Sequence, residues 1–219
     1  MNQDLRDAIT AAVELNEGAS DNPYRLSFAR KAESGASFGK MQGDLSAQQL
    51  ARDTLKKALL ANGVDMDRAT DIVAQLSRPM ATNGLDAGDD QLVEAALASN
   101  AGRSLVDEMD QQISARVIDD VEDCLDTAQA ANREVEPKAA IYMAMWINMS
   151  GPPTTLKVWL GGQDVFLAHH TRRVAAPGDV VTAADVEGYL QATDYFTANP
   201  RNFAHLEEAA AAGVTAMTA

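Results

Sequence analysis

Cysteine is almost absent from this chain, because Cys124 is the one cysteine among 219 residues. An internal disulfide and a cysteine-based metal cluster are therefore both excluded. Aromatic residues are also scarce, at 5% of the chain. No apolar run approaches the roughly 18 to 20 residues that cross a bilayer. The sequence thus predicts neither a disulfide scaffold nor a membrane-spanning helix, and it places Cys124 in an apolar helical stripe as a small core residue.

Basic residues are also few relative to acidic ones. The chain carries 18 Lys and Arg against 32 Asp and Glu, which gives a formal net charge of −14. Phosphate backbones are bound by clustered Lys and Arg, so nucleic acid is excluded as an expected partner. The N-terminus also lacks the basic start and uninterrupted apolar stretch of a secretory signal. We therefore expect synthesis in the cytoplasm without a signal peptide.

What the sequence does hold is the composition of a helical protein. Ala, Leu and Met are abundant, and Ala and unbranched side chains lose little entropy in a helix. Apolar residues from Leu5 to Val13 recur at helical spacing, which predicts a first helix that ends near Gly18. Similar patterns predict further helices over residues 46–61, 66–76, 89–98, 103–133, 137–150, 155–162, 183–196 and 201–211.

Residues 19–43 interrupt this pattern, because they are rich in Gly, Ser, Asn and Pro and show no sustained period. We expect an ordered loop or a small β-hairpin region here, and a long loop inside a compact domain is usually functional. No internal repeat and no linker divides the chain. The prediction is a mainly α fold, with one domain over residues 1–219.

Three carboxylates, Glu17, Glu33 and Asp44, lie in or beside this irregular segment. Glycoside cleavage needs a protonated carboxylic acid beside the glycosidic oxygen, and usually a second carboxylate that activates water or stabilises the oxocarbenium-like centre. The acid must be partly buried, because desolvation raises a carboxyl pKa. A helical projection puts Glu17 at the edge of the apolar face of the first helix and Glu14 toward water. An ordinary helix-terminal glutamate is the alternative interpretation of Glu17.

The order of motifs in this segment resembles the lysozyme superfamily. Phage-type and pesticin-like muramidases carry Glu-Gly after their first helix, as Glu17-Gly18 does here. They then carry a Gly-containing Thr-Ile-Gly segment, whose place Ser37-Phe38-Gly39 takes. Goose-type lysozymes and soluble lytic transglycosylases carry a Gly-Leu-Met-Gln motif after the catalytic glutamate, and the segment FGKMQGD, residues 38–44, is similar to it.

A second stretch, AAIYMAMWINMSGPP, is similar to the core helix of phage-type lysozymes, which ends in Phe-Asn-x-Gly. The counterparts are Trp146, Asn148 and Gly151, with one extra residue before the glycine. Together the matching parts cover about a quarter of the chain. The resemblance implies a lysozyme-like domain that cleaves β-1,4-linked aminosugar polymers, and it implies no cofactor and no metal.

The resemblance also assigns roles by position. Glu17 would be the general acid that protonates the leaving oxygen. Asp44, and in second place Glu33, match acids proposed to hold a water. The expected substrate-binding side chains are Tyr24, Ser37, Gln42 and Asn148. Inverting hydrolysis, retaining hydrolysis and transglycosylation all stay open, as does the oligomeric state.

Peptidoglycan is the predicted substrate, reached by release through a pore or by injection through a secretion machine. Two alternatives remain. A chitosanase or chitinase would suit the acidic chain, because chitosan is cationic. A non-catalytic helical module of a phage or secretion system would keep only the scaffold. The adjacent histidines His169 and His170 lack a third ligand at characteristic spacing, so we predict a solvated polar turn there rather than a metal site.

Overall fold

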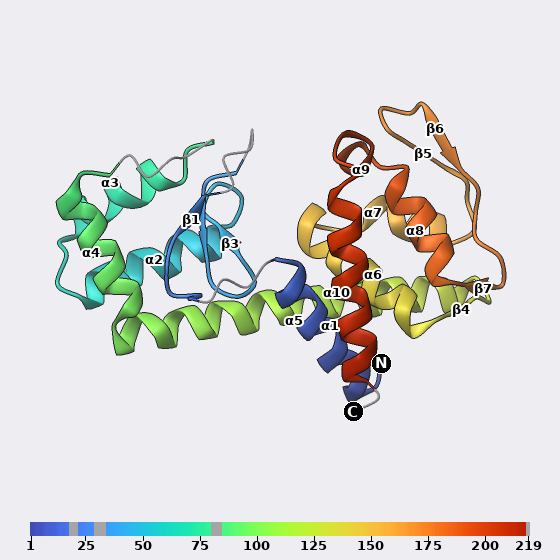
Figure 1. Ribbon diagram of the computed structural model, residues 1–219, viewed down its shortest axis with the longest axis horizontal. Coiled ribbons are helices and arrows are strands. Elements are labelled where there is room, and N and C mark those ends of the chain that lie inside the picture. The colour runs from blue at the N-terminus through green and yellow to red at the C-terminus, as the bar shows by residue number, and fades with distance from the viewer. Residues whose placement is uncertain (18–21, 29–33, 80–84, 218–219) are drawn as a thin grey trace. The chain divides into compact units, whose positions relative to one another are not determined.

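The computed structural model describes residues 1–17, 22–28, 34–79 and 85–217 (Figure 1). These residues form mostly helices, which three small sheets accompany, so the prediction of a mainly α fold is confirmed. The chain divides into two compact units. One unit holds Met1–Asn16 together with Ala115–Ala219, and the other holds Glu17–Ser114. The long helix α5, Asn100–Ala130, contributes its residues to both.

The unit over Glu17–Ser114 opens with an antiparallel sheet in the order β1-β2-β3. Its pairs are Ser27 with Ser37 and Ser37 with Asp44, so the predicted hairpin region is confirmed. The elements of this unit, apart from the first half of α5, are β1 Ser27–Phe28, β2 Ala36–Phe38, β3 Gly43–Asp44, α2 Gln49–Ala61, α3 Met66–Leu76 and α4 Ala87–Ala98.

Short polar side chains set the helix starts in this unit. The prediction that α2 begins at residue 46 is wrong by three residues, because Oδ1 of Asp44 accepts hydrogen bonds from N and Oγ of Ser46 and holds a turn there. Asp65 and Asp86 are the N-caps of α3 and α4, and their side chains accept backbone N–H groups of the first turn. These caps satisfy donors that a helix start leaves unpaired.

Helix α2 forms the centre of this unit, since it packs against α3, α4 and β3. Its buried face meets apolar side chains from the sheet and the other helices, with Phe38, Met41, Leu45, Ile72, Leu76, Val93 and Leu97 all at 2% exposure or less. The corner between α4 and α5 is tight. A Cβ on Gly102 would lie 1.9 Å from the backbone oxygen of Ala96, so only glycine fits there.

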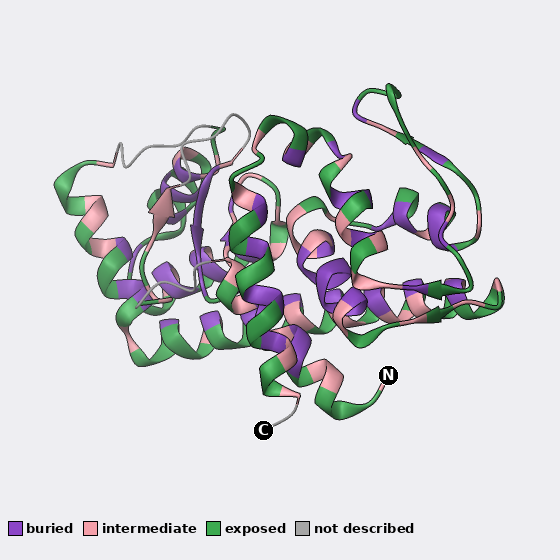
Figure 2. Ribbon diagram, turned by 45° about the vertical axis from the view of Figure 1, so that its right-hand side comes forward, coloured by how far each residue is buried: buried purple, intermediate pink, exposed green. Residues whose placement is uncertain are grey.

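The other unit is built around α6, Pro137–Ser150, which is buried nearly all round, as Figure 2 shows. Proline at its first position favours its start, and Gly151 (φ 82°) ends it before Pro152. Around α6 stand α1 Gln3–Asn16, α7 Thr154–Leu160, α8 Ala183–Gln191, α9 Asp194–Ala198 and α10 Asn202–Ala216, with the second half of α5.

Helices α1 and α10 lie antiparallel along each other, visible as the blue and red helices of Figure 1. At one end of the pair, Nε2 of His205 lies 3.1 Å from the carbonyl oxygen of Asn16. Toward the other end, a Cβ on Gly213 would lie 2.9 Å from the carbonyl oxygen of Ala8. The glycine therefore permits close contact between two helices at opposite ends of the chain.

Two small strand pairs complete this unit. Strands β4 Glu134–Val135 and β7 Val180–Val181 are parallel, and strands β5 Val165–Leu167 and β6 Arg172–Val174 form an antiparallel hairpin. His169 and His170 lie exposed in the turn of that hairpin, as predicted. The sequence did not predict its strands, because only Val165 on β5 is buried and no alternating pattern results.

The prediction of one helix over residues 183–196 is wrong, because the chain breaks at Thr193 between α8 and α9. Thr193 is extended (φ −72°, ψ 157°), and its hydroxyl accepts the N–H of Phe196 to begin α9. Thr182 caps the start of α8 and forms a capping box with Asp185. Cys124 is 0% exposed, which confirms its prediction as a core residue.

None of the helices in the described ranges combines the length and the apolar character that a bilayer crossing requires.

Candidate functional site

Glu17 is the residue that follows α1 directly, in a turn, and its side chain is half-buried. Four apolar residues of α1 are fully or almost fully buried, namely Ala8, Ile9, Ala12 and Val13. Glu17 comes four residues after the last of these, which is one helical turn. The sequence-based expectation of a half-withdrawn carboxyl at the helix end therefore agrees with its burial. Glu14, predicted to face water, is also half-buried.

Asp44 belongs to β3, and its carboxylate holds a turn of the backbone. Its Oδ1 accepts hydrogen bonds from N of Gly35 (3.0 Å), N of Ser46 (2.7 Å) and Oγ of Ser46 (2.8 Å). All three donors reach the same oxygen. Among the described residues, none donates a hydrogen bond to Oδ2.

Ser37 lies in the same sheet as Asp44, and Gln42 lies in the turn that joins β2 to β3. Both polar atoms of the Gln42 carboxamide make hydrogen bonds. Its Oε1 accepts one from Oγ of Ser27 (2.6 Å), and its Nε2 donates one to the carbonyl of Gly39 (2.9 Å). The backbone of Gln42 is left-handed (φ 49°). The Ser37 side chain is 8% exposed. These two residues are brought together with Asp44, and their contacts fix the shape of the loop between β2 and β3.

A residue that the sequence analysis did not select, Asp110 on α5, anchors this loop. Its carboxylate is buried at 7% exposure and accepts the backbone N–H groups of Lys40 (2.9 Å) and Met41 (3.0 Å). A Cβ on Gly39 (φ 85°) would lie 2.5 Å from its Oδ1. An aspartate on the apolar face of a predicted helix was the available signal, because a buried carboxylate needs partners.

Tyr24 is half-buried, and it contacts the first half of α5. Its hydroxyl donates to Oδ1 of Asp107 (2.9 Å), and the guanidinium of Arg103 lies 5.0 Å from the centre of its ring. The hydrogen bond to Asp107 raises the pKa of Tyr24. The predicted hydrogen-bonding tyrosine is thus tied to the helix that carries Asp110.

The resemblance also selects Glu33 and Asn148 for the site. Glu33 lies outside the described residues. Asn148 lies half-buried near the C-terminal end of α6 and belongs to the other unit. The structure therefore gathers Ser37, Gln42 and Asp44 in the β2–β3 hairpin, and it places Glu17 at the helix end that precedes this hairpin in the chain.

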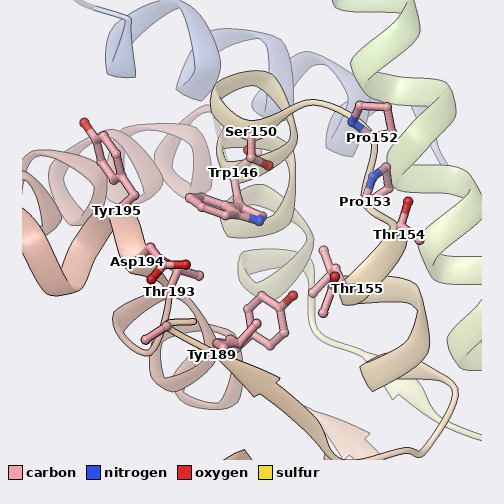
Figure 3. Close-up of a pocket in the computed structure, with 13 residues that line it drawn as sticks. Trp146, Ser150, Pro152, Pro153, Thr154, Thr155, Tyr189, Thr193, Asp194 and Tyr195 are labelled. Carbon is pink, nitrogen blue, oxygen red and sulfur yellow. The ribbon is translucent and has the colours of Figure 1, made fainter. Parts of the chain in front are cut away.

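The unit that holds α6 contains a pocket of about 370 Å³, drawn in Figure 3. Trp146 of α6 occupies its middle. Tyr195 and Asp194 lie on one side of the indole, and Thr154 and Thr155 at the start of α7 lie on the other. Trp146 is half-buried, whereas Trp159 is 1% exposed. The helix break at Thr193 is what brings α9 to this pocket.

Among the described residues, no three His, Cys, Asp or Glu side chains gather in an arrangement suited to a metal ion. Comparison with protein-family models, with curated proteins and with solved structures finds no match to this chain.

Proposed function

We propose that this chain is a glycan-cleaving enzyme with Glu17 as its general acid. The observation that carries the proposal is the half-buried carboxyl at the end of α1, followed in the chain by a three-stranded sheet that holds Asp44 on β3 and Gln42 in the turn before it. A partly desolvated carboxyl retains its proton more readily than an exposed one. A protonated carboxyl beside a glycosidic oxygen is what cleavage of that bond requires.

Asp44 is the second carboxylate of the proposal. Its three hydrogen bonds hold Oδ1 in place, so Oδ2 has a fixed position and can orient a water or interact with the developing positive charge. Gln42 is positioned by Ser27 and Gly39, which keeps the loop beside Asp44 in one shape. Fixed side chains are what a catalytic site needs, because geometry alone supplies much of the rate.

The proposed substrate is a β-1,4-linked aminosugar polymer, with peptidoglycan first. Chitosan is the second candidate, and the net charge of −14 favours it, because an acidic protein attracts a cationic polymer. The salt dependence of cleavage distinguishes chitosan from peptidoglycan as the substrate. Cleavage of chitosan would slow as ionic strength rises, since screening weakens long-range attraction.

Replacement of Glu17 tests the proposal directly. Glu17→Gln removes the proton and keeps the size, so we expect clearing of purified peptidoglycan to fall by at least about 100-fold, as expected for a lost general acid. Glu14→Gln is the matched control, because Glu14 is also a half-buried glutamate of the same helix region, and it should clear at the normal rate. Undiminished clearing by Glu17→Gln would remove the proposal.

Asp44→Asn tests the second carboxylate without disturbing the turn, because the amide oxygen can still accept the three hydrogen bonds. We expect an unchanged melting temperature and a loss of activity of about 10-fold or more. The same assays on soluble chitosan identify the substrate. If the intact protein cleaves neither peptidoglycan nor chitosan, the non-catalytic module becomes the better interpretation.

A further inference from the structure

The pocket of Figure 3 has the lining of a sugar site, and it is formed wholly by residues 146–195 of one unit. Its volume of about 370 Å³ lies at the lower end of the range for small-molecule sites, roughly 300 to 1,000 Å³. Such a volume suits a ligand of monosaccharide to disaccharide size. Three aromatic side chains, Trp146, Tyr189 and Tyr195, are part of the lining.

These rings are held firmly in place. Trp146 packs against Phe196 with ring centres 6.0 Å apart, and Tyr189 packs against Trp159 at 5.0 Å. The hydroxyl of Tyr195 accepts a hydrogen bond from Nδ2 of Asn202 (2.8 Å). Fixed aromatic faces lose little entropy when a ligand stacks on them, so binding energy is retained.

Polar groups also belong to the lining of this pocket. Within the described part of the chain, the indole N–H of Trp146 and the hydroxyls of Tyr189 and Thr155 have no protein hydrogen-bond partner. Burial raises the pKa of Tyr189, so its hydroxyl stays protonated and can donate. Oγ of Ser150 donates to the carbonyl of Trp146 and can still accept. Donors and acceptors of this kind match the hydroxyls of a sugar.

Charge narrows the class of ligand. Asp194 is the one charged residue in the lining, and it lies 3.3 Å from Nε2 of His169. No Lys or Arg side chain lines the pocket, which disfavours phosphate and other anions. The hydroxyl-bearing wall formed by Thr154 and Thr155 disfavours a purely apolar ligand. With anions and purely apolar ligands disfavoured, the lining suits a neutral ligand ring that has apolar faces and polar groups at its edge.

We propose that this pocket binds a neutral saccharide unit, with one ring face against Trp146 and its hydroxyls toward Tyr189 and Thr155. The lining carries this inference by itself, and only the choice of an N-acetylated amino sugar as the natural ligand rests on the proposed function. The pocket would hold one unit of a glycan chain, so it would contribute to affinity and not to bond cleavage.

The two tryptophans of the chain give a direct assay. Trp146 lines the pocket, whereas the N–H of the buried Trp159 donates to the carbonyl of Ala175 (2.7 Å) and serves as an internal reference. The tetramer of N-acetylglucosamine is titrated into full-length Glu17→Gln, which cannot cut it under the proposed function. We expect a saturable change in tryptophan fluorescence. Adding Trp146→Phe should abolish that change and leave the emission of Trp159.

A hydroxyl deletion serves as the second variant, because Thr155 is exposed and its replacement leaves the core intact. Thr155→Val should weaken binding about fivefold, the value of one hydrogen bond of about 1 kcal/mol. Thr197→Val, at an exposed threonine of α9 outside the lining, is the matched control and should bind normally. Circular dichroism checks that each variant is folded.

Three results would overturn the inference. One is the absence of any change that depends on Trp146 at millimolar sugar, and another is unchanged affinity in Thr155→Val. A response to a proline-rich peptide in place of the sugar would do the same, because aromatic grooves also accept such peptides. Glycan cleavage that depends on Glu17 without sugar binding here contradicts the pocket alone. Sugar binding without any cleavage contradicts the proposed function alone.

Discussion

At the scale of single residues, Asp110 has the clearest structural role. It is a buried carboxylate on a helix, and it satisfies two backbone N–H groups of the loop that leads to Gln42. A backbone loop buried against a helix must find acceptors for its N–H groups, and carboxylate oxygens are strong ones. Asp110 therefore connects the stability of this unit to the shape of the proposed site.

Substitution of Asp110 should lower the free energy of unfolding even when the new side chain has the same shape. Asp110→Asn replaces one acceptor oxygen with an NH₂ donor, which leaves one backbone N–H facing another donor. We expect a loss of about 1 to 3 kcal/mol in the free energy of unfolding, measured by urea denaturation. Asp107→Asn is the matched control on the same helix. Its oxygen can still accept from Tyr24, so its midpoint should stay close to the native value.

Cys124 gives a prediction for alkaline pH. Burial raises its pKa from the ordinary 9.0 to about 12. The folded thiol thus keeps its proton where the unfolded thiol loses it. Its contribution to stability is complete below pH 9 and is lost as the pH rises toward 12.

Urea midpoints at pH 7.5 and pH 10, with reductant present, measure this effect. The native protein should lose about 1 to 2 kcal/mol more than Cys124→Ala over that interval. Tyr142 and Tyr189 also have raised pKa values, but their ordinary value is 10.0, so they contribute mainly above this range. Equal losses in the two proteins would show that Cys124 is not the group responsible.

At the scale of elements, two helical glycines differ in how an added methyl group would change the stability of the protein. In α5, Gly102 stands against the carbonyl of Ala96 at the corner with α4. In α8, Gly188 has open space where a Cβ would point. Helix propensity favours alanine at both positions, so the difference between them comes from packing alone.

Two Gly→Ala variants test this contrast. Gly102→Ala places a methyl group 1.9 Å from a backbone oxygen, so the corner must open, and we expect a loss of several kcal/mol. Gly188→Ala should instead stabilise the protein by roughly 0.5 to 1 kcal/mol. Thermal melts of both variants give the comparison. Shifts of the same sign would contradict the packing argument.

At the scale of the whole molecule, one compact unit is assembled from the two ends of the chain. Helix α1 belongs with residues 115–219, where it packs on α6 and α10. The second unit, residues 17–114, is inserted between these pieces in the sequence. The fourteen-residue helix α1 is therefore part of the core of a unit whose remaining residues begin only at Ala115.

A rearranged fragment tests this assembly. Because α1 and α10 are antiparallel, the end of α10 and the start of α1 lie at the same end of the pair. Residues 115–217 joined to residues 1–16 by about eight Gly and Ser residues, which span roughly 16 Å, should fold cooperatively. Residues 115–217 alone should melt at a lower temperature or without a sharp transition. Equal melting of the two fragments would contradict a structural role for α1.

The sequence by itself determined the helical character and most helix positions, because the period of the apolar residues and a cap such as Thr182 are local properties. It also indicated the hairpin region and the half-burial of Glu17. The single domain over 1–219 and the roles of the site residues stay predictions. No local pattern distinguishes the buried Asp110 from an exposed acid. Nor does any local pattern show whether Asp44 serves to hold a turn or to take part in catalysis.

Only the tertiary structure decided how distant segments meet. It joined α1 to α10, set Asp110 beneath the loop at Gly39, broke the helix at Thr193 and placed Trp146 in a pocket instead of the core. The physical reason is the same in each case. Packing and buried hydrogen bonds depend on neighbours in space, and helical periodicity records only which face of an element is buried, not what covers it.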